Sequence, residues 1–176
     1  MRPVNPQRGS LEAHFGNLVA TSLRVQVGVN DPTLEEYLTT LVVGFLRADA
    51  PPVRIGMPLL PQVVKLATDA DAIDPSTGQR ERAISLHQAV GDAVLFVGGM
   101  FPNQLSGKRL RKPKIRRVPI VDEVELARCS YRRAGELAQA DDYARAGLFR
   151  RLSQGFETFM FSLQIVGDEV RLRKPA

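Results

Sequence analysis

The chain has one cysteine, two histidines and no tryptophan in 176 residues, and each scarcity removes a class of protein. A lone Cys129 forms neither an internal disulfide nor a cysteine-based zinc site, which fits a reducing compartment. His14 and His87 belong to no i,i+4 ligand pair and no HExxH pattern. We therefore expect no bound metal and no cofactor.

Long hydrophobic runs are also missing. No run approaches the roughly 18 apolar residues of a membrane span, and the opening MRPVNPQRGS lacks the hydrophobic stretch of a signal peptide. The overall content, 44% hydrophobic and 24% charged, is that of a globular domain and not of a disordered chain. We expect a cytoplasmic protein of bacterial type with a core built mainly from Leu, Val and Ala.

Apolar residues recur at three- and four-residue spacing along most of the chain, which predicts helices. One helix begins after Asp31, a suitable N-cap, with Pro32 at its first position, and ends near Arg47. The spacing predicts further helices over 59–70, 79–100, 122–139 and 142–166. We expect an all-α compact bundle of five or six helices in a single domain, residues 10–170, with flexible ends at 1–9 and 171–176.

The predicted helix 79–100 is apolar around most of its circumference, so we place it at the centre of the fold. Gly91, Gly98 and Gly99 lie inside it. They do not stand between a strand and a helix, so they form no phosphate-binding loop. They predict either a close approach of another helix or a kink before Pro102.

Residues 10–29 allow two interpretations. Leu11, Phe15 and Leu18 fit one helical face, whereas Val19 to Val29 show the alternation of a strand. We favour a helix to about Leu23 followed by an extended tail, because no second strand signal lies nearby to pair with a first. Whether 19–29 is strand or helix stays open at this point.

Charge is concentrated in residues 108–117, KRLRKPKIRR, which hold seven of the 24 Lys and Arg and no acid. Without them 17 basic residues face 19 acidic ones, so this decapeptide carries the whole net charge of +5. It lies in a predicted connector, 106–119. The candidate anion-binding residues are Lys108, Arg109, Arg111, Lys112, Lys114, Arg116 and Arg117.

Such a segment has two interpretations. Seven cations are able to pair with phosphates in a salt-sensitive, sequence-independent way. However, no aromatic residue interrupts the run to stack on bases, and Pro113 prevents a continuous basic helix. A solvated loop, or a contact for an acidic protein or membrane surface, fits the same residues.

Residues 90–102, VGDAVLFVGGMFP, precede a Tyr- and Ala-rich helix and a Phe-rich final segment. In this order of elements, residues 80–166 resemble an uncharacterised family of bacterial all-helical proteins that carries a Gly-Asp-x-x-Leu-Phe-x-x-Gly-x-Phe helix. The resemblance implies an all-α fold in a bacterial setting and no assigned activity. Cys129 stands where the family tends to have glycine, and the connector is longer and more basic.

Three polar residues fall on predicted core faces: Asp92, His87 and Tyr131. A buried carboxylate needs a partner, and Arg128, Tyr131 or Arg132 on the next helix offers one. We expect Asp92 to join helices and His87 to be a satisfied interior histidine. Cys129 is expected to be a small buried hydrophobe. We assign no catalytic residue.

The leading hypothesis is a non-enzymatic helical interaction or regulatory module that uses 108–117 to contact a protein partner. Non-specific nucleic-acid binding through the same segment is one alternative. A small enzyme with a site near Asp92 and His87 is another, and a homodimer is compatible with the sequence.

Overall fold

The computed structural model describes residues 6–48, 51–105 and 122–172, with side chains from Leu11 onward. The described part of the chain holds α-helices, short 3-10 and π-helical segments, and no strand. The seven α-helices are α1 (Pro6–Thr21), α2 (Pro32–Arg47), α3 (Leu59–Asp71), α4 (Arg80–Met100), α5 (Glu123–Ala138), α6 (Tyr143–Gln154) and α7 (Phe156–Leu172). The all-α prediction is confirmed, whereas the expected number of five or six helices is too low.

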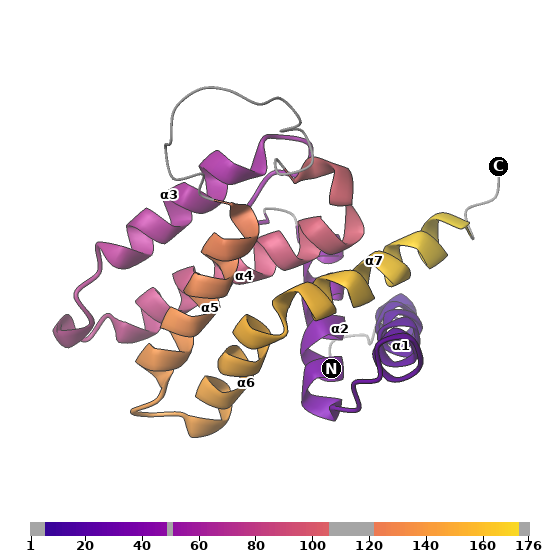
Figure 1. Cartoon of the computed structure of the whole chain (residues 1–176), viewed down its shortest axis with the longest axis horizontal. Coiled ribbons are helices and arrows are strands. Elements are labelled where there is room, and N and C mark those ends of the chain that lie inside the picture. The colour runs from indigo at the N-terminus through magenta and orange to yellow at the C-terminus, as the bar shows by residue number, and fades with distance from the viewer. Residues whose placement is uncertain (1–5, 49–50, 106–121, 173–176) are drawn as a thin grey trace.

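Helix α4 forms the centre of the fold, as its apolar sequence predicts. Thirteen of its 21 residues are buried, and α3, α5 and α7 all pack on it (Figure 1). Among the described residues α4 is also the one helix long and apolar enough to cross a membrane by length and composition, with 72% of the apolar window buried inside the fold. A core helix gives that combination.

Two of the α4 glycines permit a close approach of α7. A Cβ added at Gly98 would lie 2.5 Å from Sδ of Met160, and one added at Gly99 would overlap Cβ of Leu163. A larger residue at Gly99 would push the two helices apart, whereas one at Gly98 would first displace the flexible Met160 side chain. Of the two expectations for these glycines, close helix packing is the one that the structure shows.

The segment predicted as one helix over 142–166 is two helices. Asp142 caps α6 by accepting a hydrogen bond from the backbone N–H of Arg145. The helix ends at Gly155, whose N–H donates to the carbonyl oxygen of Arg151, and α7 starts at Phe156. The apolar stripe continues through the break, with Phe149, Leu152, Phe156 and Phe159 all in the core. Periodicity alone therefore does not reveal the break.

The N-terminal helix extends beyond both predicted limits. It begins at Pro6, and after Thr21 the chain continues as a π-helix over Ser22–Val27 and stops at Gly28, whose φ is 76°. The expected extended tail after Leu23 is wrong, because helical hydrogen bonds satisfy this backbone. The alternating apolar residues of this segment do not form one buried face, because Val25 is 73% exposed.

Helix α2 is anchored as expected and tied to the π-helix. Asp31 accepts hydrogen bonds from the N–H groups of Thr33 and Leu34. Arg24 of the π-helix forms a two-point ion pair with the buried Glu35, at 2.6 Å from Nε to Oε1 and 2.5 Å from Nη2 to Oε2. These contacts fix the start of α2 and tie α2 to the π-helix.

Candidate functional site

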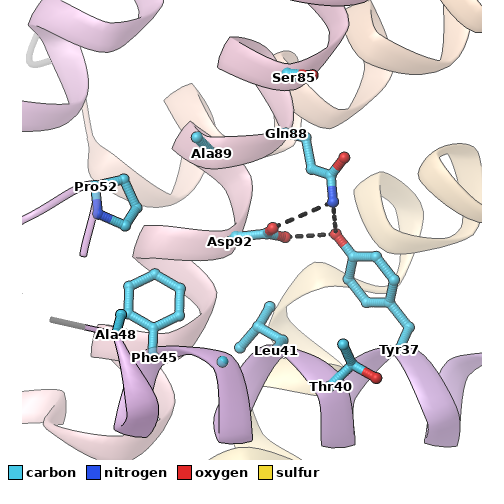
Figure 2. Close-up of a pocket in the computed structure, with 11 residues that line it drawn as sticks. Tyr37, Thr40, Leu41, Phe45, Ala48, Pro52, Ser85, Gln88, Ala89 and Asp92 are labelled. Atoms are coloured by element: carbon cyan, nitrogen blue, oxygen red, sulfur yellow. Dashed lines mark hydrogen bonds between the residues drawn. The ribbon is translucent and has the colours of Figure 1, made fainter. Parts of the chain in front are cut away.

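An open cavity of about 360 Å³ lies between α2 and α4. Most of its wall is apolar, and its polar side chains are few and face one region. Figure 2 shows Asp92, Gln88 and Tyr37 on one side and Phe45, Ala48 and Pro52 on the other. The eleven lining residues are Tyr37, Thr40, Leu41, Gly44, Phe45, Ala48, Pro52, Ser85, Gln88, Ala89 and Asp92.

Asp92 joins three helices at the wall of this cavity. Its Oδ1 accepts a hydrogen bond of 2.5 Å from the hydroxyl of Tyr37 on α2 and one of 2.7 Å from the hydroxyl of Tyr131 on α5. Its Oδ2 accepts a longer bond of 3.4 Å from Nε2 of Gln88, which also donates to the Tyr37 hydroxyl at 3.2 Å. The carboxyl is thus oriented by three neutral donors.

Burial governs the ionisation of this cluster. Removal from water raises the pKa of Asp92 from 3.8 to about 6, although the hydrogen bonds from Tyr37, Tyr131 and Gln88 act in the opposite direction. Burial and the neighbouring Asp92 charge raise the pKa of Tyr37 and of Tyr131 well above their usual value. Near neutral pH the cluster is therefore one carboxylate held by two neutral phenols.

Tyr131 was one of three partners proposed for Asp92, and it is the one that bonds. The other two candidates point elsewhere: Arg128 donates to the carbonyl oxygen of Ser153, and Arg132 donates to Sγ of Cys129. The sequence interpretation missed Tyr37 and Gln88. A tyrosine on the apolar face of a helix was the available signal for Tyr37, because a buried hydroxyl needs a partner.

His87 does not share this cavity with Asp92. The two residues are five positions apart on α4, which places them about 140° apart around the helix. His87 lines a second cavity of about 250 Å³ between α3, α4 and α5. The enzyme hypothesis based on both residues therefore lacks a common site.

His87 is buried but only partly satisfied. Its Nε2 lies 3.5 Å from Oδ1 of Asp71, while Nδ1 has no hydrogen-bond partner. Burial, the largest effect, lowers the pKa of His87, so the imidazole is neutral near pH 7. His87 is thus an interior residue, but among the described residues its Nδ1 lacks the hydrogen bond of a satisfied histidine.

Cys129 lies in the same second cavity as His87, and it is partly exposed instead of fully buried as expected. Its Sγ lies 3.5 Å from Oε1 of Glu125 and 3.3 Å from Nη2 of Arg132. Burial and the hydrogen bond to Glu125 raise the pKa of the Cys129 thiol. A raised pKa keeps sulfur protonated near neutral pH, so this environment does not activate a nucleophile.

The remaining residues considered from the sequence lie away from the α2–α4 cavity or outside the described chain. His14 is exposed on α1, with its ring edge-on to Phe15 at 5.4 Å between centroids. The basic residues of 108–117 lie outside the described residues, as does the predicted connector 106–119. The anion-binding expectation therefore stays a prediction from sequence.

Among the cavities lined by described residues, the one between α2 and α4 combines a mostly apolar wall with polar groups that face one region. Comparisons with protein-family models, curated proteins and solved structures find no match to this chain. The resemblance of residues 80–166 to a bacterial helical family accordingly stays a prediction.

Proposed function

We propose that the chain is a non-enzymatic helical interaction module that binds a small, largely apolar molecule in the cavity between α2 and α4. One observation carries the proposal: the apolar wall and the Asp92–Tyr37–Gln88 cluster converge on one open cavity of about 360 Å³. Small-molecule sites have this character, a concave apolar surface with a few fixed polar groups.

The rigidity of the wall supports binding. Phe45 stacks on the core residue Phe96 with 4.4 Å between ring centroids and 12° between planes. Leu41 is 7% exposed, and Asp92 is held from two other helices. A site that is already ordered loses little conformational entropy when a ligand enters.

Gly44 offers a way to test the site without disturbing the fold. It lines the cavity, and a Cβ added to it meets no atom within 4 Å. Gly44→Leu should fill the cavity while improving helix propensity. Gly147→Leu on α6 is the matched control, since Gly147 also has open space around it and lies outside the cavity.

The assay measures the fluorescence of N-phenyl-1-naphthylamine, an apolar probe that is uncharged near neutral pH, as each protein is added. We expect saturable binding to wild type and to Gly147→Leu, and at least about tenfold weaker binding to Gly44→Leu. Equal binding to all three proteins, or no saturable binding to wild type, would overturn the proposed function.

The basic segment 108–117 supports a second candidate, contact with an anionic partner. Its concentrated charge favours salt-dependent association with nucleic acid or with an acidic protein. Titration of a labelled duplex at two salt concentrations tests the nucleic-acid form. Wild type is compared with a variant in which Arg109, Arg111, Arg116 and Arg117 are all replaced by Ser. Binding that is absent, or equal in both proteins, rejects nucleic acid.

A further inference from the structure

The α2–α4 cavity takes its charge from a single lining side chain. Among its eleven lining residues Asp92 alone carries a formal charge. The hydrogen-bond partners of Asp92 are two phenols and an amide, so no cationic side chain of the described chain contacts it. A partly buried carboxylate without a cationic partner is costly, and a ligand cation would offset that cost.

One guanidinium group contacts a hydrogen-bond partner of Asp92, and it is already engaged. Arg145 of α6 bonds to Oε1 of Glu81 at 2.6 Å and to Oε1 of Gln88 at 3.3 Å. It therefore reaches Asp92 only through Gln88. This arrangement orients the Gln88 amide, whose Nε2 faces Asp92, and leaves the charge of Asp92 uncompensated by direct contact.

The two carboxylate oxygens of Asp92 differ in what they accept. Oδ1 receives both tyrosine hydroxyls, at 2.5 and 2.7 Å. Oδ2 receives only the 3.4 Å bond from Gln88. A carboxylate oxygen accommodates two hydrogen bonds. Oδ2 thus keeps acceptor capacity for a donor that enters the cavity.

Aromatic residues line the space around this carboxylate. Figure 2 shows the rings of Tyr37 and Phe45 on opposite sides of the cavity. Aromatic faces attract cations, most strongly where water is excluded. Thr40 and Ser85 also line the cavity, and a side-chain hydroxyl is able to accept a hydrogen bond from an ammonium group.

From the single uncompensated carboxylate, its open Oδ2 and the aromatic walls, we propose that the ligand is an organic amine with an apolar body. Its ammonium group binds Asp92 Oδ2, and its apolar part lies against Leu41, Phe45 and Pro52. This inference rests on the proposed function and specifies the ligand class of the same site. It requires the ionised carboxylate, which is the main form of Asp92 above about pH 6.

Three probes with one apolar body separate the two proposals: 4-phenylbutylamine, 4-phenylbutanol and 4-phenylbutyrate. Each is titrated at about pH 7.5, where Asp92 is ionised, by calorimetry or protein NMR. We expect wild type to bind the amine at least about tenfold more tightly than the alcohol, and the acid most weakly, because a charge-assisted hydrogen bond is stronger than a neutral one.

Asp92→Asn should abolish the preference for the amine and keep binding of the alcohol, which shows that the cavity is intact. Asp69→Asn is the matched control, since Asp69 is an exposed carboxylate on α3 paired with Lys65. It should keep the preference. If Asp92→Asn fails to fold, the ratio of the affinities of wild type for the amine and the alcohol alone tests the amine inference.

The outcomes distinguish failure of the amine inference from failure of the proposed small-molecule site. Equal affinity of wild type for amine and alcohol, with Gly44→Leu weakening both, would overturn the amine inference and leave the cavity as a site for neutral ligands. An amine preference that survives in Asp92→Asn would also overturn it. Failure of Gly44→Leu to weaken any probe would reject the cavity itself.

Discussion

A Cβ added to Gly91 would lie 2.5 Å from Cζ of Tyr131. The Tyr131 ring therefore packs directly on the Gly91 backbone of α4, and its hydroxyl donates to Asp92. The Tyr131 ring has no exposed surface, and the rings of Phe149 and Phe156 stand about 6 Å away. It has no space into which to move. The glycine and the hydrogen bond are therefore parts of one arrangement.

Gly91→Ala should destabilise the fold by about 2 kcal/mol, because overpacking displaces the Tyr131 ring and breaks its bond to Asp92. Urea unfolding measures this change. The control is Gly147→Ala, where the added Cβ meets nothing within 4 Å, and which should stabilise by up to about 1 kcal/mol. Equal effects of the two substitutions would contradict the close contact.

Removing the hydroxyl of Tyr131 should change Asp92 directly. In Tyr131→Phe the carboxylate loses a donor that favours its charged form, so its pKa should rise above about 6. We expect a stability loss of about 1–2 kcal/mol. Carboxyl-carbon NMR follows the titration, and Tyr143→Phe, at a site 76% exposed, should leave it unchanged. An unaltered Asp92 titration in Tyr131→Phe would show that the bond is absent in solution.

The pH dependence of stability should report Asp92. Its pKa is raised from 3.8 in the unfolded chain to about 6 in the fold, so the native state binds this proton more tightly. The associated stabilisation is complete below about pH 3.8 and is lost as the pH rises through about 6. Relative to Asp92→Asn, wild type should lose about 3 kcal/mol across this window, since one pKa unit corresponds to about 1.4 kcal/mol.

Unfolding of both proteins at several pH values measures the Asp92 difference. Tyr37 and Tyr131 also face the carboxylate, but their raised pKa values keep them neutral throughout the window. Arg145 reaches Asp92 only through Gln88 and does not contact the carboxylate directly. A difference between wild type and Asp92→Asn that does not vary with pH would refute the buried carboxyl.

The effect of His87 on the pH dependence of stability should be opposite to that of Asp92. Burial lowers its pKa below 6.5, so the unfolded chain takes up this proton more readily. Its contribution is present above about pH 6.5 and is lost as the pH falls through the lower, folded value. Wild type should thus lose stability on acidification relative to His87→Met. Asp71, Arg133 and Glu136 surround position 87 in both proteins, so the comparison isolates the imidazole.

The stabilities of wild type and His87→Met, measured by unfolding at several pH values, also define the result that would contradict this prediction. If wild type and His87→Met lose stability in parallel between about pH 7 and 5, the imidazole is as accessible to protons in the fold as in the unfolded chain. That outcome would contradict the burial of the unpartnered Nδ1.

Much of the fold follows from local sequence signals. Asp31 and Pro32 mark the start of α2, and the broad apolar circumference of 80–100 identifies the central helix, as observed. The break at Gly155 does not follow, because both helices around it present apolar residues to one core. Likewise, nothing local distinguishes the π-helix at Ser22–Val27 from a strand-like tail.

The candidate site is less readable than the fold. Asp92 was identified because a carboxylate in an apolar helix demands a partner, and Tyr131 was among the candidates named. Its second tyrosine, Tyr37, comes from α2, 55 residues earlier. Only the packing of α2 against α4 brings the two together. The cavity has no sequence motif, since residues from α2, α4 and the segment at Pro52 meet there.

The most direct test of the binding site is an amide NMR titration of wild type with 4-phenylbutanol, which requires no assumption about ligand charge. The account predicts saturable shifts confined to α2, α4 and the segment at Pro52, including Leu41, Phe45 and Ala89, and their loss in Gly44→Leu. Shifts centred on the second cavity around Cys129, or no saturable shift, would contradict it.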